Sequence, residues 1–350
     1  MVAEALAVRV ERLLGKDLTA KALREQVLAE IRREIPFDAH VWLLTDPVTR
    51  VGTSPLADVP GMAWDELPLL GRLRYTSRTS RWSDLMDDGR HLSTLVGETE
   101  GDLSRSVLWD QWMRAYGVAD VASLALWDRY GCWAWLDLWR KDGEFTRAET
   151  AALHEMATTV ARGLREAQAR TFLTSAEPVE IGGPAVVVLD ARLRVTSTTT
   201  WAKDALHRLN PPDEPMPAIP AAVYNVAAAL LAHEDGVPVG PPWSRVHLGS
   251  GRWITLRAAR MEGPDDEAGV VVTLEPTTVD ERREVFALAH GLSPREREVL
   301  DALARGADTA AVAASLLLSE HTVQDHVKAV LAKTGTTSRQ SLLAKATGVA

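Results

Sequence analysis

The chain has 350 residues, of which 46% are hydrophobic and 25% are charged, and its formal net charge is −9 at pH 7. One hydrophobic core rarely serves so long a chain, so we expect two or three domains. The acidic balance excludes a protein that coats nucleic acid over its whole surface, and the single cysteine, Cys132, excludes an intramolecular disulfide and a thiolate metal cluster.

The sequence contains no signal for a membrane or for secretion. No apolar run reaches the roughly 18 residues that cross a bilayer. The opening residues, MVAEALAVRVERLLGK, intersperse acidic and basic side chains and lack the apolar stretch of a signal peptide. We therefore expect a cytoplasmic protein with no membrane partner. The dominance of Arg among the basic residues and the abundance of Ala are typical of a high-GC bacterial genome.

The first region is predicted to mix helices and strands. Helical spacing of apolar residues predicts an N-terminal helix over 1–17 and a second helix that ends before Pro36. Three apolar runs bounded by polar residues predict strands at 40–45, 121–127 and 132–139. Thr146 and Glu149 form a capping box, which predicts the start of a long helix. We expect this helix to close the first domain near residue 172.

A second group of strands is predicted after a linker at 173–182. Two apolar runs on either side of a short turn predict a hairpin, at 185–190 and 193–197. Three further strands are predicted at 245–248, 253–259 and 270–274. Helices are predicted from Trp201 and from Ala221. Between them, residues 210–220 hold five prolines and predict an irregular loop.

Both regions are similar to sensor families. The segment GEFTRAE leads from the last predicted strand of the first region into its final helix, and residues 18–172 resemble a GAF domain. Residues 183–276 resemble a PAS domain in the order of their elements, which is two strands, short helices and three antiparallel strands. The resemblance implies two antiparallel-sheet sensor domains, so the predicted fold is multidomain α+β.

The C-terminal region begins with three capped helices. Ser293, Pro294 and Glu296 supply an N-cap hydroxyl, a proline at the first helical position and a capping-box carboxylate. Asp308 and Ser319 are placed to cap the next two helices. The preceding segment, 277–291, has helical composition and is predicted to be a connecting helix that links the sensors to this region.

The third of these helices is predicted to have one buried and one exposed face. Four side chains fall within about 40° of one line at about 100° per residue and are expected to pack inward: Val323, Val327, Val330 and Thr334. The outward set is His321, Gln324, Asp325, Lys328 and Ala332. In the major groove an amide pairs with adenine and an ammonium group with guanine or phosphate. We therefore predict that Gln324, Asp325 and Lys328 read DNA sequence.

Residues 292–346 closely resemble the LuxR-type DNA-binding domain, through LSPREREVL, SEHTVQDHVKAVLAKTG and Arg339. The resemblance implies a four-helix domain on double-stranded DNA, with the third helix in the major groove and the fourth, about 338–346, in a dimer contact. It implies supporting roles for Glu296 and Arg339. The predicted DNA-binding residues are Ser319, His321, Thr322, Gln324, Asp325, Lys328 and Lys333, with Thr322 and Lys333 on the DNA backbone.

Two features weaken the DNA affinity expected of one copy of this region. Residues 291–350 carry seven Lys or Arg against six Asp or Glu, so this segment is near +1 and the remainder near −10. The sequence also departs from the LuxR pattern at Ala311, where an acid is usual, and at Gln324, where lysine is common. Asp325 either reads cytosine or is a solvated helix residue. We therefore expect a homodimer on two half-sites about one helical turn apart.

Nine of the twelve tryptophans lie between Trp42 and Trp139. Alternation along the 132–139 strand places three of them on one face together with a carboxylate. Indoles around one carboxylate can bind an apolar, aromatic or cationic small molecule. The predicted ligand-binding residues are Trp42, Trp133, Trp135, Asp137 and Trp139. In the alternative interpretation, these tryptophans fill the core of the sheet.

The sequence therefore predicts a DNA-binding transcription regulator that responds to a small-molecule effector. The alternative is a regulator whose N-terminal domains serve only dimerisation or a protein partner. The sequence has no P-loop, no Gly-rich dinucleotide turn, no HExxH, no GxSxG and no cluster of metal ligands. No enzyme, cofactor or metal site is predicted.

Overall fold

The computed structural model describes residues 2–77, 79, 81–174, 182–209, 221–262 and 269–348. The predicted linker at 173–182 lies mostly outside these residues, and the predicted loop at 210–220 lies entirely outside them. The chain forms two compact units. Unit 1 consists of residues 1–164, 180–246 and 254–276, and unit 2 consists of residues 165–179, 247–253 and 277–350.

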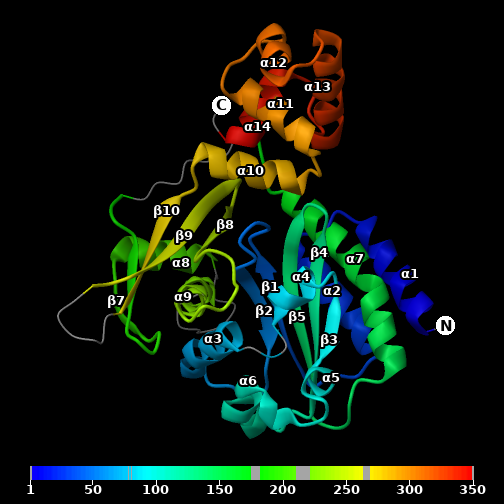
Figure 1. The fold of residues 1–350 in the computed structure, drawn as a ribbon, viewed down its shortest axis with the longest axis vertical. Helices are drawn as coiled ribbons and strands as arrows, with labels where there is room; N and C mark the ends of the chain where they lie inside the picture. Colours follow the sequence, from blue (N-terminus) through cyan, green and yellow to red (C-terminus); the bar gives the residue numbers. More distant parts are fainter. Residues whose placement is uncertain are drawn as a thin grey trace. The chain divides into compact units, whose positions relative to one another are not determined.

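The first sheet of unit 1 has five antiparallel strands in the order β2-β1-β5-β4-β3 (Figure 1). They are β1 (Ala39–Thr45), β2 (Gly52–Asp58), β3 (Leu92–Thr94), β4 (Asp120–Asp128) and β5 (Gly131–Arg140). The strands predicted at 40–45, 121–127 and 132–139 are confirmed. Strand β2 was not predicted, because GTSPLAD has the composition of a turn. Its position at the edge of the sheet accommodates Pro55.

Helices cover both faces of this sheet. One face carries α1 (Val2–Leu14), α2 (Ala20–Arg32) and the part of α7 (Arg147–Ala169) that belongs to unit 1 (Figure 1). The predicted N-terminal helices are confirmed, and their apolar residues, such as Val10 and Val27, are fully buried. The segment between β2 and β4 adds α3 (Leu67–Thr76), α4 (Trp82–Asp87), α5 (Leu95–Thr99) and α6 (Val107–Gln111), with 3-10 turns at Trp64–Glu66, Leu103–Arg105 and Met113–Tyr116.

The second sheet of unit 1 repeats the strand order of the first, as β7-β6-β10-β9-β8. Its strands are β6 (Val186–Leu189), β7 (Val195–Thr198), β8 (Trp243–Gly249), β9 (Arg252–Arg260) and β10 (Val270–Pro276). The helices α8 (Thr200–Leu209) and α9 (Ala221–Glu234) lie between β7 and β8 in the chain. The predicted hairpin and the three later strands are confirmed. Two five-stranded antiparallel sheets and a helical C-terminal region establish the predicted α+β fold.

Helix α9 is the main contact between the two sheets. Every residue from Ala222 to Ala232 is buried, which is expected of a helix that is apolar on all sides. The helix packs against α3 and β2 on one side and against β10 on the other. The Nδ2 of its Asn225 donates a hydrogen bond to the Gly52 carbonyl oxygen at 3.1 Å. Helix α9 therefore connects the two sheets within unit 1.

The turn between β1 and β2 makes a second contact between the sheets. Asp46 in this turn and Arg245 in β8 form an ion pair in which both side chains are 0% exposed. The Arg245 Nε lies 2.7 Å from Asp46 Oδ2, and Nη2 lies 3.0 Å from Oδ1. A Cβ at Gly240 would overlap the carbonyl group of Thr49, so this position requires glycine. We name residues 46–52 the joint.

Unit 2 contains five consecutive helices after β10. The first, α10 (Val279–Ala289), lies within the predicted connecting segment and begins with a capping box formed by Thr278 and Glu281. An aromatic cluster lies beside it: Phe172, Trp253, Phe286 and His290. No helix in the described part of the chain combines the length and apolarity needed to cross a membrane.

Candidate DNA interface and ligand cavity

Four short helices follow α10: α11 (Pro294–Ala304), α12 (Thr309–Leu316), α13 (Glu320–Thr334) and α14 (Arg339–Thr347). The predicted caps are confirmed. Ser293 and Glu296 form a complete capping box on α11. Asp308 Oδ1 accepts a hydrogen bond from the Ala311 N–H at 2.8 Å, and Ser319 Oγ accepts one from the Thr322 N–H at 3.1 Å.

The buried face of α13 is the predicted one. Val323, Val330 and Thr334 are at most 2% exposed, and Val327 is half-buried against the same core. The core partners come from α11 and α12 and include Val299, Leu303, Val312 and Ala313. Because three helices contribute to one small core, the rotation of α13 about its axis is fixed.

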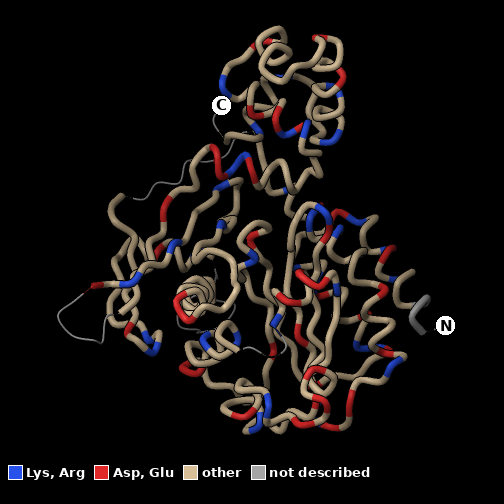
Figure 2. The backbone as a smooth tube through the Cα atoms, in the orientation of Figure 1, with Lys and Arg blue, Asp and Glu red and all other residues tan. Residues whose placement is uncertain are grey.

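The opposite face of α13 presents the predicted polar stripe to solvent: His321, Gln324, Asp325, Lys328 and Ala332 are exposed. Asp325 lies between two of the others, with His321 Nε2 at 3.5 Å and Lys328 Nζ at 3.6 Å from its carboxylate. Charges of both signs are interspersed along these helices (Figure 2). Lys328 therefore offsets part of the repulsion that Asp325 exerts on phosphate.

Residues 290–346 match the family described as bacterial regulatory proteins, luxR family. This segment is a LuxR-type helix-turn-helix domain. No curated protein matches the chain. A solved structure, the crystal structure of the phage VqmA–DPO complex, aligns at 18% identity over 47% of this chain and 81% of that chain, with a TM-score of 0.22. A TM-score this low does not establish a shared fold.

Three other predicted contact residues of the LuxR-type domain have internal partners. Ser319 caps α13, and its Oγ lies 2.8 Å from the Oγ1 of the half-buried Thr322. Lys333 Nζ donates to Glu296 Oε2 at 2.6 Å and to the Gly291 carbonyl oxygen at 3.3 Å. Lys333 therefore links α13 to Glu296 on α11 and to the chain before that helix. DNA contact by these three residues stays a prediction.

Glu296 joins α11 to α13. Its carboxylate accepts hydrogen bonds from the Ser293 N–H at 2.7 Å and from Lys333. Burial acts to raise the pKa of Glu296, but the hydrogen bond from Lys333 and those from Ser293 outweigh it, so the pKa lies below its usual range. The supporting role that the resemblance implies for Glu296 fits these contacts.

Helix α14 is held by polar contacts at both ends. The Arg339 Nη2 donates to Thr309 Oγ1 on α12 at 3.1 Å, and Lys345 Nζ donates to the Thr334 carbonyl oxygen at 2.8 Å. Leu342 and Ala346 are fully buried. These contacts fit the supporting role that the resemblance implies for Arg339. The dimer contact of this helix stays a prediction.

The turn between α12 and α13 contains a strained residue that was not predicted from the sequence. Leu317 has a left-handed backbone (φ 54°, ψ 46°), and its side chain is 92% exposed, so burial does not compensate for the strain. We expect Leu317→Gly to stabilise unit 2 by about 0.5–1 kcal/mol, because glycine adopts this conformation without a steric penalty. Slower hydrogen exchange of α12 and α13 amides would show this.

The control for this prediction is Leu317→Ala. Alanine also lacks the exposed side chain but keeps the Cβ that causes the strain, so hydrogen exchange of the two helices should change little. If glycine and alanine protected the α12 and α13 amides equally, the stabilisation would come from removal of the exposed leucine side chain and not from relief of backbone strain.

Unit 1 contains a largely apolar cavity, which we name the ligand cavity. It has about 680 Å³ of empty space including its open mouth. Its walls come from β1, β2 and β5 of the first sheet and from α3, α4, the 3-10 turn Met113–Tyr116 and α9. They include Leu43, Met62, Leu70, Met113 and Tyr224. Helix α9 thus closes a cavity over the face of the first sheet.

The predicted carboxylate in this cavity, Asp137, already has a buried cationic partner, Arg74. The Arg74 guanidinium stacks 3.8 Å from the centre of the Trp82 ring, and its Nη2 lies 3.2 Å from Asp137 Oδ1. The Trp82 Nε1 also donates to Asp137 Oδ1, at 2.9 Å. Burial lowers the pKa of Arg74, although Asp137 counteracts it. Asp137 is thus already neutralised, which argues against a cationic ligand.

The five predicted ligand-binding residues do not all line one cavity. Asp137 and Trp139 line the ligand cavity, and the Trp139 Nε1 has no hydrogen-bond partner among the described residues. Trp135 lines an adjoining pocket, whereas Trp133 lines neither space. Trp42 pairs with Leu136 in the sheet register, so strand alternation places it on the opposite face, away from both spaces.

The cavity residues that were not predicted from the sequence are chiefly Arg74, Tyr75 and Trp82. They lie in α3 and α4, more than 50 positions before Asp137, and no spacing rule connects them to β5. The one signal in the sequence was Trp82, one of the nine clustered tryptophans. It stacks on Trp135 with ring centres 5.7 Å apart and an interplanar angle of 4°.

Proposed function

We propose that this protein is a transcription regulator that binds double-stranded DNA as a homodimer and responds to a small apolar molecule. The observation that carries the proposal is the exposed polar face of α13 in a LuxR-type domain. In this proposal α13 enters the major groove, where Gln324 and Lys328 contact base edges or phosphate. The two sheets of unit 1 act as GAF-like and PAS-like sensor domains.

The readout face is tested by selecting DNA from a random library with the full chain and measuring affinity by fluorescence anisotropy. Gln324→Ala should cost about 1–3 kcal/mol on the selected sequence and relax specificity at one position. Lys328→Ala should weaken binding to all sequences and reduce the slope of the salt dependence by about one. Failure to enrich any sequence would contradict sequence-specific binding.

A matched control is Lys141→Ala. Lys141 is exposed and lies in unit 1, directly after β5. Its loss removes the same charge from the protein as the loss of Lys328 does. DNA affinity should stay the same, and an equal effect of the two variants would show that overall charge, not the face of α13, controls binding.

The sensor part of the proposal is tested by native mass spectrometry, followed by DNA binding with and without any retained molecule. A ligand that binds two states unequally shifts their balance, so the DNA affinity should change. A chain with no bound molecule, no affinity for apolar probes and unchanged DNA binding would favour the other interpretation. In that case the two sheets serve dimerisation or a protein partner.

A further inference from the structure

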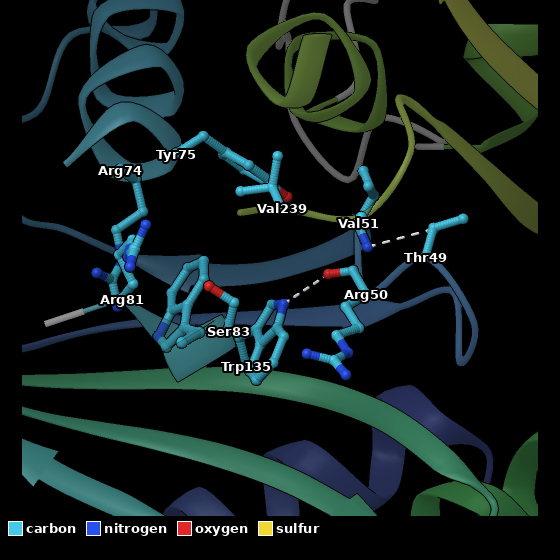
Figure 3. A pocket seen from close by; sticks show the side chains of 11 residues that line it. Thr49, Arg50, Val51, Arg74, Tyr75, Arg81, Ser83, Trp135 and Val239 are labelled. Carbon is cyan, nitrogen blue, oxygen red and sulfur yellow. Dashed lines mark hydrogen bonds between the residues drawn. The ribbon is translucent and has the colours of Figure 1, made fainter. Parts of the chain in front are cut away.

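A second pocket lies beside the ligand cavity, and its charged groups are all of one sign. Figure 3 shows Arg50, Arg74 and Arg81 around it, together with Ser83 and Trp135. It has about 400 Å³ of empty space including its mouth. No carboxylate belongs to its lining among the described residues. We name this space the arginine pocket.

The two spaces are neighbours because they share part of one wall. Arg74, Tyr75 and Trp82 line both the ligand cavity and the arginine pocket. The ligand cavity is mainly apolar, whereas the arginine pocket collects guanidinium groups. One molecule with a charged end and an apolar body would match this change of chemistry.

The arginines differ in how firmly each is held by an acid. Arg74 keeps its buried contact with Asp137, with side chains 7% and 4% exposed. Arg50 pairs with Asp87 at 2.6 Å, but these side chains are 30% and 53% exposed. Exposed ion pairs contribute little free energy, so Arg50 can exchange Asp87 for another anion at small cost.

Arg81 is the second arginine that can contact a bound anion. It pairs with Asp84 one turn along α4, with side chains 16% and 34% exposed. Guanidinium groups bind carboxylates through two parallel hydrogen bonds, which makes arginine well suited to such a ligand. Arg50 and Arg81 are therefore the residues we expect at a carboxylate, and the buried Arg74 adds positive potential beside them.

The backbone of the joint positions Arg50. The Arg50 backbone is left-handed (φ 63°), and the Arg50 N–H donates a hydrogen bond to the Asp46 carbonyl oxygen at 2.9 Å. Its own carbonyl oxygen accepts a hydrogen bond from Trp135 Nε1 at 2.8 Å, drawn in Figure 3. A strained backbone conformation persists where surrounding contacts fix it. Here hydrogen bonds fix both the N–H and the carbonyl group of Arg50.

We propose that the effector is an amphiphilic anion whose carboxylate lies in the arginine pocket and whose apolar body lies in the ligand cavity. The proposal rests on the proposed function, because it assigns a chemical class to the effector of that same site. Of the apolar, aromatic and cationic classes that the sequence left open, it sets aside the cationic class, since the Arg74 guanidinium already pairs with Asp137.

The test compares decanoate with methyl decanoate on the full chain by isothermal titration calorimetry. The two probes share an apolar chain and differ in charge. Decanoate should bind about tenfold more tightly, because its carboxylate gains charge-assisted hydrogen bonds. Arg50→Gln and Arg81→Gln should each remove most of this advantage and leave the affinity for the methyl ester unchanged.

The matched control is Arg72→Gln, which changes an exposed arginine of α3 that lines neither space. It should preserve the preference for decanoate. Equal or tighter binding of the methyl ester would overturn the anionic class but leave an apolar effector in place. If Arg50→Gln and Arg81→Gln both bind decanoate as tightly as the unchanged protein does, the assignment of the carboxylate to the arginine pocket is overturned. Failure of both probes to bind would overturn this proposal and the effector cavity of the proposed function together.

Discussion

Arg245→Met should lower the free energy of unfolding of unit 1 by about 3–5 kcal/mol, because it leaves a buried carboxylate without its cation. Asp46 and Arg245 are both 0% exposed and are joined by hydrogen bonds at 2.7 and 3.0 Å. Asp46 also accepts hydrogen bonds from the Val48 and Thr49 N–H groups. The substitution therefore also weakens the joint itself.

Urea unfolding followed by tryptophan fluorescence measures this effect. All tryptophans except Trp253 belong to unit 1, so the signal reports mainly on that unit. The control is Arg162→Met, which breaks an exposed pair with Glu11 in the same unit, at 44% and 54% side-chain exposure. It should cost less than about 1 kcal/mol. A comparable loss in both variants would mean that the buried pair has no special role.

The joint also bears on how a ligand would act. The ligand cavity is bounded by α3 and the first sheet on one side and by α9 on the other. Gly52, at the end of the joint, donates its N–H to the Tyr75 hydroxyl at 2.8 Å and accepts a hydrogen bond from Asn225. Both of these side chains line the cavity. A molecule bound there would therefore contact the groups that hold the two sheets together.

The elements that the sequence predicted are those with a local signal. The apolar runs of β4 and β5 are almost wholly buried, and the polar caps of α11 and α13 are used as expected. Strand β2 has no such signal, because its pairing with β1 and not its own composition makes it a strand. The exposed polar face of α13 followed from helical periodicity alone.

Contacts between distant segments could not be predicted in this way. Asp46 and Arg245 are 199 positions apart, and neither residue type suggests burial. Periodicity places Trp135 and Asp137 on one face of a strand but does not show that Trp82 stacks on the first and Arg74 pairs with the second. The resemblance implied a DNA contact for Lys333, but nothing in the sequence indicated that its ammonium group also binds Glu296 on α11.

Unit 2 has a long-range feature of the same kind. Phe172 stacks on Trp253 with ring centres 5.0 Å apart and meets Phe286 edge to face at 5.4 Å. His290 packs on Phe286 at 4.2 Å, and His247 packs on Trp253 at 5.5 Å. The cluster therefore connects Phe172, His247 and Trp253 to α10, the helix that precedes the LuxR-type domain.

The two histidines should make unit 2 sensitive to acid. Burial, with smaller contributions from nearby Lys and Arg, lowers the pKa of His290 and of His247 to about 4 each. In an unfolded chain both have a pKa of about 6.5, so between these values the unfolded state binds more protons. Stability is therefore present above about pH 6.5 and falls as the pH drops towards 4. At pH 4.5, each histidine should lower the free energy of unfolding of unit 2 by about 2–3 kcal/mol.

Hydrogen exchange of α10 amides at pH 7.5 and 4.5, corrected for intrinsic rates, measures this loss. In His290→Asn the difference between the two pH values should shrink by about half, because one of the two titrating groups is gone. Val285→Ala is the control, since Val285 is fully buried on the same helix and its loss removes no titrating group and no ring contact of either histidine. It should lower protection equally at both pH values, and a pH dependence that His290→Asn leaves unchanged would show that other groups govern the acid response.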